Sequence, residues 1–395
     1  MSSASGSGSP TRRLVLVVGI GRSGTSLLTG ILSRLGFHVP RPEVKADGTN
    51  PRGFGEPRWV VDFHTRLMRE RRVHRFDSRP DAWSSTAEAA ADEQAFADLR
   101  DWLAVQFVGV ENVVVKDPRI DWFLPLWLRC AKELGAQTSF ATMLRHPAEV
   151  VRSARDSYGT WQADASRAAS WLNATLHTEH ATRGARRAFV RYDALLEDWS
   201  REIARVAELL ELDWLQGIEA AAHPQVNELV DPTLRRARVA WDELEVPPAL
   251  RALLDGTWQQ MIRLAEPEGD GEPARAVLDG LRADYDRFYA DAEAIAQSSV
   301  LAAGRRRGGG GRANGGARGA GFPRNFKRLA ARGVRLLPRE HQERVYRAAT
   351  GAWLGAGGLT SLPLRVALLV PPRYRERAPL PLVRMVLRVF RARQR

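Results

Sequence analysis

Residues 14–36 of this 395-residue chain, LVLVVGIGRSGTSLLTGILSRLG, constrain its fold more than any other stretch. They begin with five apolar residues, which predict a buried strand, and they end with apolar residues at helical spacing. A glycine-rich turn joins the two parts. Loops that lead from a strand into a helix bind phosphate, because backbone N–H groups and the helix dipole both favour an anion there. The stretch therefore predicts an α/β fold with a phosphate site after its first strand.

The loop offers one cation and several hydroxyl groups, but it lacks the lysine of triphosphate-binding loops. Those loops read Gly-x-x-x-x-Gly-Lys-[Ser/Thr]. Here Gly19 and Gly24 have that spacing, while Thr25 stands where the lysine would be. The loop favours a single 5′-phosphate that carries a transferable group; an ordinary tight turn and a dinucleotide-binding turn, which lacks its third glycine, are the alternatives. The residues expected to hold the phosphate are Gly21, Arg22, Ser23, Gly24, Thr25 and Ser26.

Residues 138–155, TSFATMLRHPAEVVRSAR, contain a second candidate phosphate contact. A predicted strand over 139–144 ends at Arg145, and a helix from about Ala148 carries Ser153 on its second turn. The two side chains can converge on one phosphate, because a guanidinium donates a bidentate contact and a hydroxyl donates one more. Taken alone, this pattern is equally typical of surface residues near a helix start.

Predicted strands alternate with predicted helices along the chain, which indicates a mostly parallel sheet with the first strand central. The run VVVKDPR predicts another central strand. An irregular segment that covers the site is expected over 223–239. Helical patterns are expected over 86–108, 164–183, 198–212 and 245–295.

Together, the two phosphate motifs resemble the sulfotransferase family that uses 3′-phosphoadenosine 5′-phosphosulfate (PAPS). RSGTS is similar to the family's 5′-phosphosulfate loop, with Arg22 where many members have lysine, and Arg145 with Ser153 matches the 3′-phosphate motif. FVRYDALLEDW is similar to a third family segment, which implies that Tyr192 lies near the nucleotide. The resemblance covers about residues 12–215. It implies a three-layer α/β/α fold with a central, mostly parallel sheet, similar to P-loop NTPases, and PAPS as co-substrate.

Sulfuryl transfer needs a cation near the sulfonate and a base that takes the proton of the acceptor. Arg22 is the first candidate cation. Lys116 is the second, because it ends a predicted strand at the sheet edge where ligands bind in open α/β folds. It is one of only four lysines against 55 arginines, which suggests a need for a compact charge there. A structural pairing of Lys116 with Asp117 or another acid stays open.

The segment DGTNPRGFGEPR resembles a stretch of many bacterial sulfotransferases, and this resemblance implies that Glu56 is the catalytic base. The alternative is an acid that only favours the dipole of the following helix. His64 is the second candidate base, Asp117 is a candidate neighbour of the acceptor, and His146 is expected beside the 3′-phosphate. No histidine has metal-ligand spacing, and Cys130 is the single cysteine, so neither a metal site nor a disulfide is expected.

Positive charge is concentrated at the C-terminal end. Residues 304–395 carry 22 basic and 3 acidic residues, whereas the whole chain has a net charge of +13. The Gly/Arg-rich stretch cannot bury enough apolar surface to fold and predicts a flexible linker. The expected organisation is a disordered N-terminus over 1–11, a sulfotransferase domain over 12–296, a linker over 297–322 and a basic helical extension over 323–395.

Helices are expected in the extension over 324–337, 339–353 and 380–394, the last with arginines on one side and apolar residues on the other. Such a helix suits an anionic membrane surface or a partner. Packing on the acidic domain is an alternative, and nucleic-acid binding a weaker one, because aromatic residues are not interleaved. With no predicted membrane span or signal peptide and one cysteine, we expect a cytoplasmic protein, held peripherally at the inner membrane face if the tail binds lipid.

Two other function classes stay open. A small-molecule kinase or NTPase would use a similar sheet, but it would need a lysine after Gly24 and an acidic strand end for magnesium. An inactive nucleotide-binding scaffold is implied if Glu56 and Lys116 lie far from the nucleotide. The sequence does not identify the acceptor or the oligomeric state. The expected acceptor is a hydroxyl (or amine) of a carbohydrate or lipid-linked glycan; protein tyrosine, antibiotic and phenolic acceptors are alternatives.

Overall fold

The computed structural model describes residues 12–159, 161–231, 233 and 241–308. A sheet of four parallel strands in the order β2-β1-β3-β4 forms its centre. The strands are β1 (Arg13–Val18), β2 (Asn112–Lys116), β3 (Gln137–Leu144) and β4 (Arg186–Arg191). β1 lies between β2 and β3, as predicted, and its continuous apolar sequence is typical of strands covered on both faces. The strand predicted over VVVKDPR is β2, which lies at the edge of this sheet and not at its centre.

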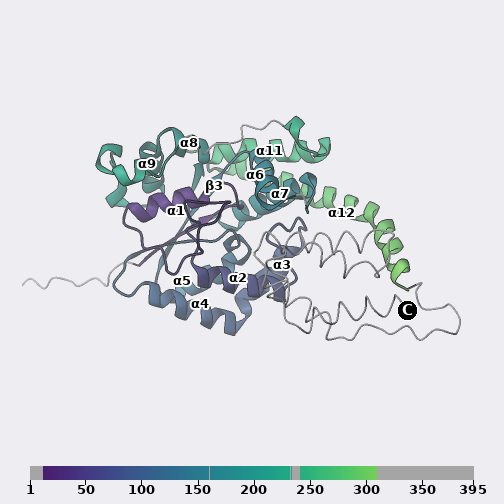
Figure 1. Cartoon of the computed structure of the whole chain (residues 1–395), viewed down its shortest axis with the longest axis horizontal. Helices are drawn as coiled ribbons and strands as arrows, with labels where there is room; N and C mark the ends of the chain where they lie inside the picture. The colour runs from purple at the N-terminus through teal and green to yellow at the C-terminus, as the bar shows by residue number, and fades with distance from the viewer. Residues whose placement is uncertain (1–11, 160, 232, 234–240, 309–395) are drawn as a thin grey trace, which may run out of the picture. The chain divides into compact units, whose positions relative to one another are not determined.

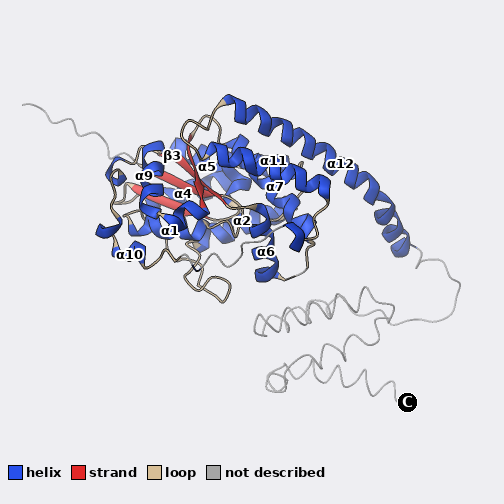
Figure 2. Ribbon diagram, turned by 90° about the horizontal axis from the view of Figure 1, so that it is seen from above, coloured by secondary structure: helices blue, strands red, loops and turns tan. Residues whose placement is uncertain are grey.

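Helices cover both faces of the sheet (Figure 1), and Figure 2 shows the strands enclosed between them. Side chains of β1 alternate between two cores: Leu14 and Leu16 face one, Val15 and Val17 the other. The first core contains residues of α2 (Arg58–Glu70), α3 (Ala82–Ala87), α4 (Glu93–Gln106), α5 (Leu124–Glu133), α6 (Pro147–Tyr158), α7 (Asp164–Ala181), α11 (Pro248–Leu264) and α12 (Glu272–Gly308). The second contains residues of α1 (Thr25–Arg34), α8 (Tyr192–Glu197), α9 (Trp199–Leu209) and α10 (Pro224–Asn227). The three-layer α/β/α prediction is confirmed.

The prediction of one continuous helix over residues 86–108 is wrong. The structure has the end of α3, a 3₁₀ turn at Glu88–Ala91 and then α4. Asp92 has extended backbone and its carboxylate accepts a hydrogen bond from the N–H of Ala95 at 3.0 Å. An N-cap of this kind starts a new helix, and for that reason the helical pattern is interrupted there. The helices predicted over 164–183, 198–212 and 245–295 correspond to α7, α9 and α11 with α12.

The last helix of the described chain ends later than the sequence predicts. α12 continues to Gly308, into the stretch predicted as a linker, where Leu301, Ala302, Ala303 and three arginines have high helix propensity. The compact unit that contains the sheet ends at Gly304. Residues 1–11, the rest of the predicted linker, the predicted helices of the extension and most of the predicted irregular segment after 231 lie outside the described residues. No helix within the described ranges is long and apolar enough to cross a membrane.

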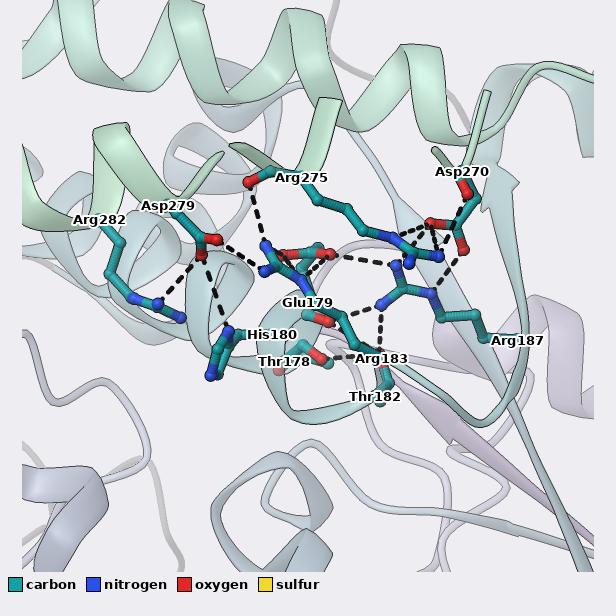
Figure 3. A network of polar contacts seen from close by, with 10 residues as sticks. All are labelled: Thr178, Glu179, His180, Thr182, Arg183, Arg187, Asp270, Arg275, Asp279 and Arg282. Atoms are coloured by element: carbon teal, nitrogen blue, oxygen red, sulfur yellow. Dashed lines mark hydrogen bonds and ion pairs between the residues drawn. The ribbon is translucent and has the colours of Figure 1, made fainter. Parts of the chain in front are cut away.

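A network of ion pairs holds the start of α12 against α7 and β4 (Figure 3). Arg187 on β4 lies 3.1 Å from Glu179 on α7 and 2.6 Å from Asp270. Arg183 on α7 pairs with Glu179 at 2.7 Å and with Asp279 on α12 at 2.8 Å. The side chains of Arg187 and Glu179 are almost fully buried, and a buried charge is stable only with its partners in place. The network therefore fixes the relative position of these three elements.

Candidate functional site

The phosphate loop, residues 19–26, connects β1 to α1. The backbone φ angle is positive at Gly19 (118°), Arg22 (79°) and Gly24 (103°). Residues in this left-handed region, placed between ordinary ones, form a concave nest of N–H groups that suits an anion. No described residue accepts a hydrogen bond from the N–H of Thr25 or Ser26, as expected for the first turn of a helix. The loop therefore has the shape and the donors of a phosphate site.

Two glycines of the loop lie too close to neighbouring groups to carry a side chain. A Cβ atom on Gly24 would lie 2.4 Å from a ring carbon of Tyr192. A Cβ atom on Gly19 would lie 2.9 Å from the carbonyl oxygen of Met143 on β3. Together with positive φ, these distances explain why glycine occupies both positions. Tyr192, the first residue of α8, packs directly against the loop.

The second phosphate motif contacts this loop. The Nε atom of Arg22 donates to the hydroxyl oxygen of Ser153 at 3.0 Å, and Arg145 donates to the carbonyl oxygen of Arg22 at 3.1 Å. The Arg145 guanidinium lies 4.7 Å from the centre of the Tyr192 ring and donates to Glu149 at 2.9 Å. Four residues that the sequence singled out from three separate segments thus meet at the carboxyl edge of the sheet.

Lys116, at the end of β2, forms a buried ion pair with Glu56. Its Nζ atom lies 2.6 Å from a carboxylate oxygen of Glu56, and the two side chains are 3% and 10% exposed. The same Nζ donates to the hydroxyl oxygen of Ser26 at 3.3 Å and to the carbonyl of Phe54 at 3.2 Å. The acid that pairs with Lys116, which the sequence did not identify, is therefore Glu56 and not Asp117. The pair places the candidate base and the second candidate cation beside the phosphate loop.

Replacing Lys116 by methionine should strongly destabilise the fold. Methionine fills much of the volume of lysine but leaves the Glu56 carboxylate buried without a partner, which we expect to cost about 3–5 kcal/mol. Adding Glu56→Gln removes the second charge and should recover a large part of the loss. Urea unfolding of wild type, Lys116→Met and the double variant measures both effects. Equal stability of wild type and Lys116→Met would contradict the pairing.

Asp117 and His64 form a second buried cluster, which lies away from solvent. His64 Nδ1 and a carboxylate oxygen of Asp117 are 2.7 Å apart, and the Trp127 indole donates to His64 Nε2 at 3.0 Å. Neither side chain has exposed surface, and Arg119 also pairs with Asp117. Burial lowers the pKa of His64 despite its carboxylate partner. With both ring nitrogens occupied, His64 is placed to support the end of β2 and not to accept a proton from a substrate.

Asp121 is a candidate supporting residue that no motif indicated. Its two carboxylate oxygens accept from the N–H of Gly19 at 3.2 and 3.3 Å, and the residue is 2% exposed. Burial raises its pKa to about 7, and the hydrogen bond from Gly19 offsets this effect only in part. Because Asp121 holds the first residue of the phosphate loop, it helps to fix the position of the loop. The sequence signal is weak, since a single acid after the KDPR run matches no pattern.

The raised pKa of Asp121 predicts a stability that depends on pH. An unfolded carboxyl titrates near its ordinary value of 3.8, so at mildly acidic to neutral pH the folded protein binds more protons than the unfolded chain. The contribution of Asp121 to stability should therefore fall as pH rises through that interval. Asp121→Asn keeps an acceptor for Gly19 without the charge, so its stability relative to wild type should increase from about pH 5 to about pH 8. Urea unfolding at several pH values measures this change, and a constant difference would contradict it.

Other predicted site residues have supporting positions. Ser23 donates its hydroxyl hydrogen to the carbonyl of Ile20 at 2.7 Å and so braces the loop. His146 is the N-cap of α6 and accepts from the N–H of Ala148 at 3.3 Å. Among the described residues, no group of three or more His, Cys, Asp or Glu is arranged to hold a metal ion.

The segment that precedes Glu56 also contributes contacts that the motifs did not indicate. Arg22 donates to the carbonyl of Thr49 at 3.4 Å, and the side-chain amide of Asn50 donates to the hydroxyl oxygen of Ser26 at 3.3 Å. Thr49 and Asn50 lie in the same stretch as Glu56, the one that resembles bacterial sulfotransferases. This stretch therefore contributes contacts to the phosphate loop as well as the candidate base.

Comparison with known proteins matches one family model to about half of the chain. The model of a family described as the sulfotransferase family matches residues 15–216, which is just over half of the 395 residues. The sulfotransferase domain of the Synechococcus PCC 7002 olefin synthase is 17% identical, with a TM-score of 0.39, over 65% of this chain and 96% of that domain. The sulfotransferase domain from the curacin biosynthetic pathway is 15% identical, with a TM-score of 0.36, over 64% and 97%. No curated protein matches. On the match of the family model, the chain belongs to the sulfotransferase family.

Proposed function

We propose that the protein transfers a sulfuryl group from PAPS to a hydroxyl or amine of an acceptor. The observation that carries this proposal is the contact between Arg22 and Ser153, because it joins two phosphate motifs from distant segments into one site. A donor with a phosphate on its 3′ oxygen and another on its 5′ oxygen needs two neighbouring anion sites. A loop with Arg22 and without a terminal lysine suits a 5′-phosphosulfate better than a triphosphate.

In this proposal, the loop and the start of α1 hold the 5′-phosphosulfate. Backbone N–H groups of the first helical turn donate to it, and the Arg22 guanidinium adds a full positive charge. Arg145 and Ser153 hold the 3′-phosphate, and Tyr192 supports Arg145 through its ring face. The residues assigned to donor binding are Gly21, Arg22, Ser23, Gly24, Thr25, Ser26, Arg145, Ser153 and Tyr192.

In the proposed transfer step, Glu56 acts as the base and Lys116 as a cation. The acceptor oxygen forms a bond to sulfur as its proton passes to the Glu56 carboxylate. The bond between sulfur and the bridging oxygen breaks, and 3′-phosphoadenosine 5′-phosphate leaves with the electron pair. Lys116, which contacts the loop through Ser26, and Arg22 stabilise the charge that develops on the bridging oxygen.

Transfer of ³⁵S from labelled PAPS tests this function with a panel of sugars, glycolipids, phenols and amines. Wild type should label at least one acceptor class. Glu56→Gln should lower the rate by about 10²–10⁴-fold while PAPS still binds, because a general base contributes a factor of that order. Glu93→Gln, which changes an exposed glutamate on α4, serves as the matched control. A wild-type rate in Glu56→Gln would exclude Glu56 as the base, and PAPS binding without transfer to any acceptor would favour a scaffold.

The sequence predicts the acceptor class and the role of the basic extension. A carbohydrate or lipid-linked glycan near an anionic membrane agrees with the charge of the extension. The residues of the extension that would contact lipid lie outside the described residues.

A further inference from the structure

Arg75, between α2 and α3, carries a positive charge and forms an ion pair with no described acid. Its guanidinium lies 4.6 Å from the centre of the Phe76 ring and 4.5 Å from the centre of the Tyr158 ring. No hydrogen bond or ion pair joins its side chain to another residue in the described part of the chain. Nearby arginines differ in this respect, since Arg119 pairs with Asp117 and Arg79 pairs with an acid on its own loop.

The position of Arg75 belongs to the candidate active site. Tyr158 is the last residue of α6, the helix that carries Ser153 to its contact with Arg22. Burial lowers the pKa of the Arg75 guanidinium, and among the nearby charges Arg119 lowers this pKa while Glu56 raises it. The same Glu56 charge acts on Arg119. Arg75 therefore lies on the side of the site where the candidate base is found.

Positive charge exceeds negative charge on this side. Glu56 is matched by Lys116 and Asp117 by Arg119, so Arg75 is the cation left without a counter-charge among these residues. A partly buried charge is costly to desolvate unless an anion compensates it. The donor anions already have the loop, Arg22 and Arg145 in the proposed function. The remaining group that could compensate the charge of Arg75 is an anionic group on the acceptor.

The surroundings of Arg75 also indicate what such an acceptor carries besides its charge. The buried ring of Phe76 and the half-buried ring of Tyr158 pack against the guanidinium, and Trp161, 60% exposed, packs edge-on against His74 at 5.3 Å between ring centres. Exposed aromatic rings pack well against a flat ring on a ligand. A guanidinium beside them binds a carboxylate, sulfate or phosphate through paired charge-assisted hydrogen bonds.

We propose that Arg75 is a specificity-determining residue that binds an anionic group on the acceptor, with a ring of the acceptor against Tyr158 and Trp161. This inference rests on the proposed function, because it places the acceptor beside Glu56. It narrows the substrate class to ring-containing alcohols or phenols that bear a carboxylate, sulfate or phosphate.

The test compares two probes of nearly the same shape, the anionic 4-hydroxybenzoate and the neutral 4-hydroxybenzamide. Each is titrated calorimetrically into the protein saturated with 3′-phosphoadenosine 5′-phosphate. Wild type should bind the benzoate at least about tenfold more tightly than the amide, which is the usual scale of one charge-assisted contact. Arg75→Met should lose this preference and keep its nucleotide affinity, and Arg75→Lys should keep part of it. Arg100→Met, at an exposed position on α4, is the matched control and should behave as wild type.

Each other outcome is informative. Wild type that binds the two probes equally, or binds neither, would overturn the inference, as would an undiminished preference in Arg75→Met. A loss of nucleotide affinity in Arg75→Met with the probe preference intact would assign Arg75 to the donor instead. Failure of wild type to bind the nucleotide at all would overturn the proposed function itself, so the two failures are distinguishable. If Arg75→Met unfolds, Arg75→Lys still tests the contact, since it retains charge without the planar fork.

Discussion

The Arg145→Ala variant is expected to bind 3′-phosphoadenosine 5′-phosphate at least about 100-fold more weakly than wild type, or about 3 kcal/mol. The Arg145 side chain is 9% exposed, so its charge acts in a poorly screened environment. It also donates to the carbonyl of Arg22 and thereby fixes the loop that holds the other phosphate. Calorimetric titration of both proteins measures the difference.

This substitution also removes an ion pair of Glu149, which is 6% exposed, so a loss of folding has to be separated from a loss of binding. Arg145→Lys keeps a charge near Glu149 and should fold, but it lacks the bidentate fork and should still bind more weakly. Arg191→Ala, at the end of the neighbouring strand β4, removes another arginine paired with an acid and should keep wild-type affinity. Unchanged affinity in a folded Arg145→Ala protein would contradict the assigned 3′-phosphate site.

Gly24→Ala should cause the largest loss of stability among single changes in the phosphate loop. The added Cβ would lie 2.4 Å from one ring carbon of Tyr192 and 3.0 Å from the next, at a φ angle of +103°. The ring is buried, so the loop has to move, and we expect a loss of about 3 kcal/mol or more together with loss of nucleotide binding.

Gly36→Ala provides a matched control for this effect. Gly36 follows α1 with a φ angle of +99°, nearly that of Gly24, but no atom lies within 4 Å of its added Cβ. This variant therefore pays only the backbone cost, of the order of 1 kcal/mol, and should bind nucleotide normally. Thermal unfolding and nucleotide titration of the two variants separate the cost of the backbone conformation from the cost of the contact with the Tyr192 ring. Equal losses in both would show that the Tyr192 contact contributes nothing.

Local signals made the sheet and the donor motifs predictable. The strand, glycine loop and helix over residues 14–36 are encoded by neighbouring residues, so their geometry follows from the sequence alone. Arg145 and Ser153 are fixed by the turn between β3 and α6, and Tyr192 by the end of β4. Each lies at the carboxyl edge of a parallel strand, where topology brings distant segments together.

Long-range pairings were not predictable in the same way. The partner of Lys116 is 60 residues away, and nothing in the sequence chooses Glu56 over Asp117 until α2 and β2 are packed. Asp121 and Arg75 match no motif, because their importance arises from burial and from the charges around them. The interrupted helix before α4 shows the reverse case, in which one capping residue, Asp92, overrides a helical pattern.

Titration of wild type with 3′-phosphoadenosine 5′-phosphate shows whether the proposed donor site at the joined phosphate motifs binds the PAPS nucleotide. The titration is run without magnesium and then repeated with ATP and magnesium present. We predict tight, metal-independent binding that ATP with magnesium does not displace. No binding of the 3′-phosphorylated nucleotide, with binding of ATP and magnesium in its place, would contradict the account and favour a kinase.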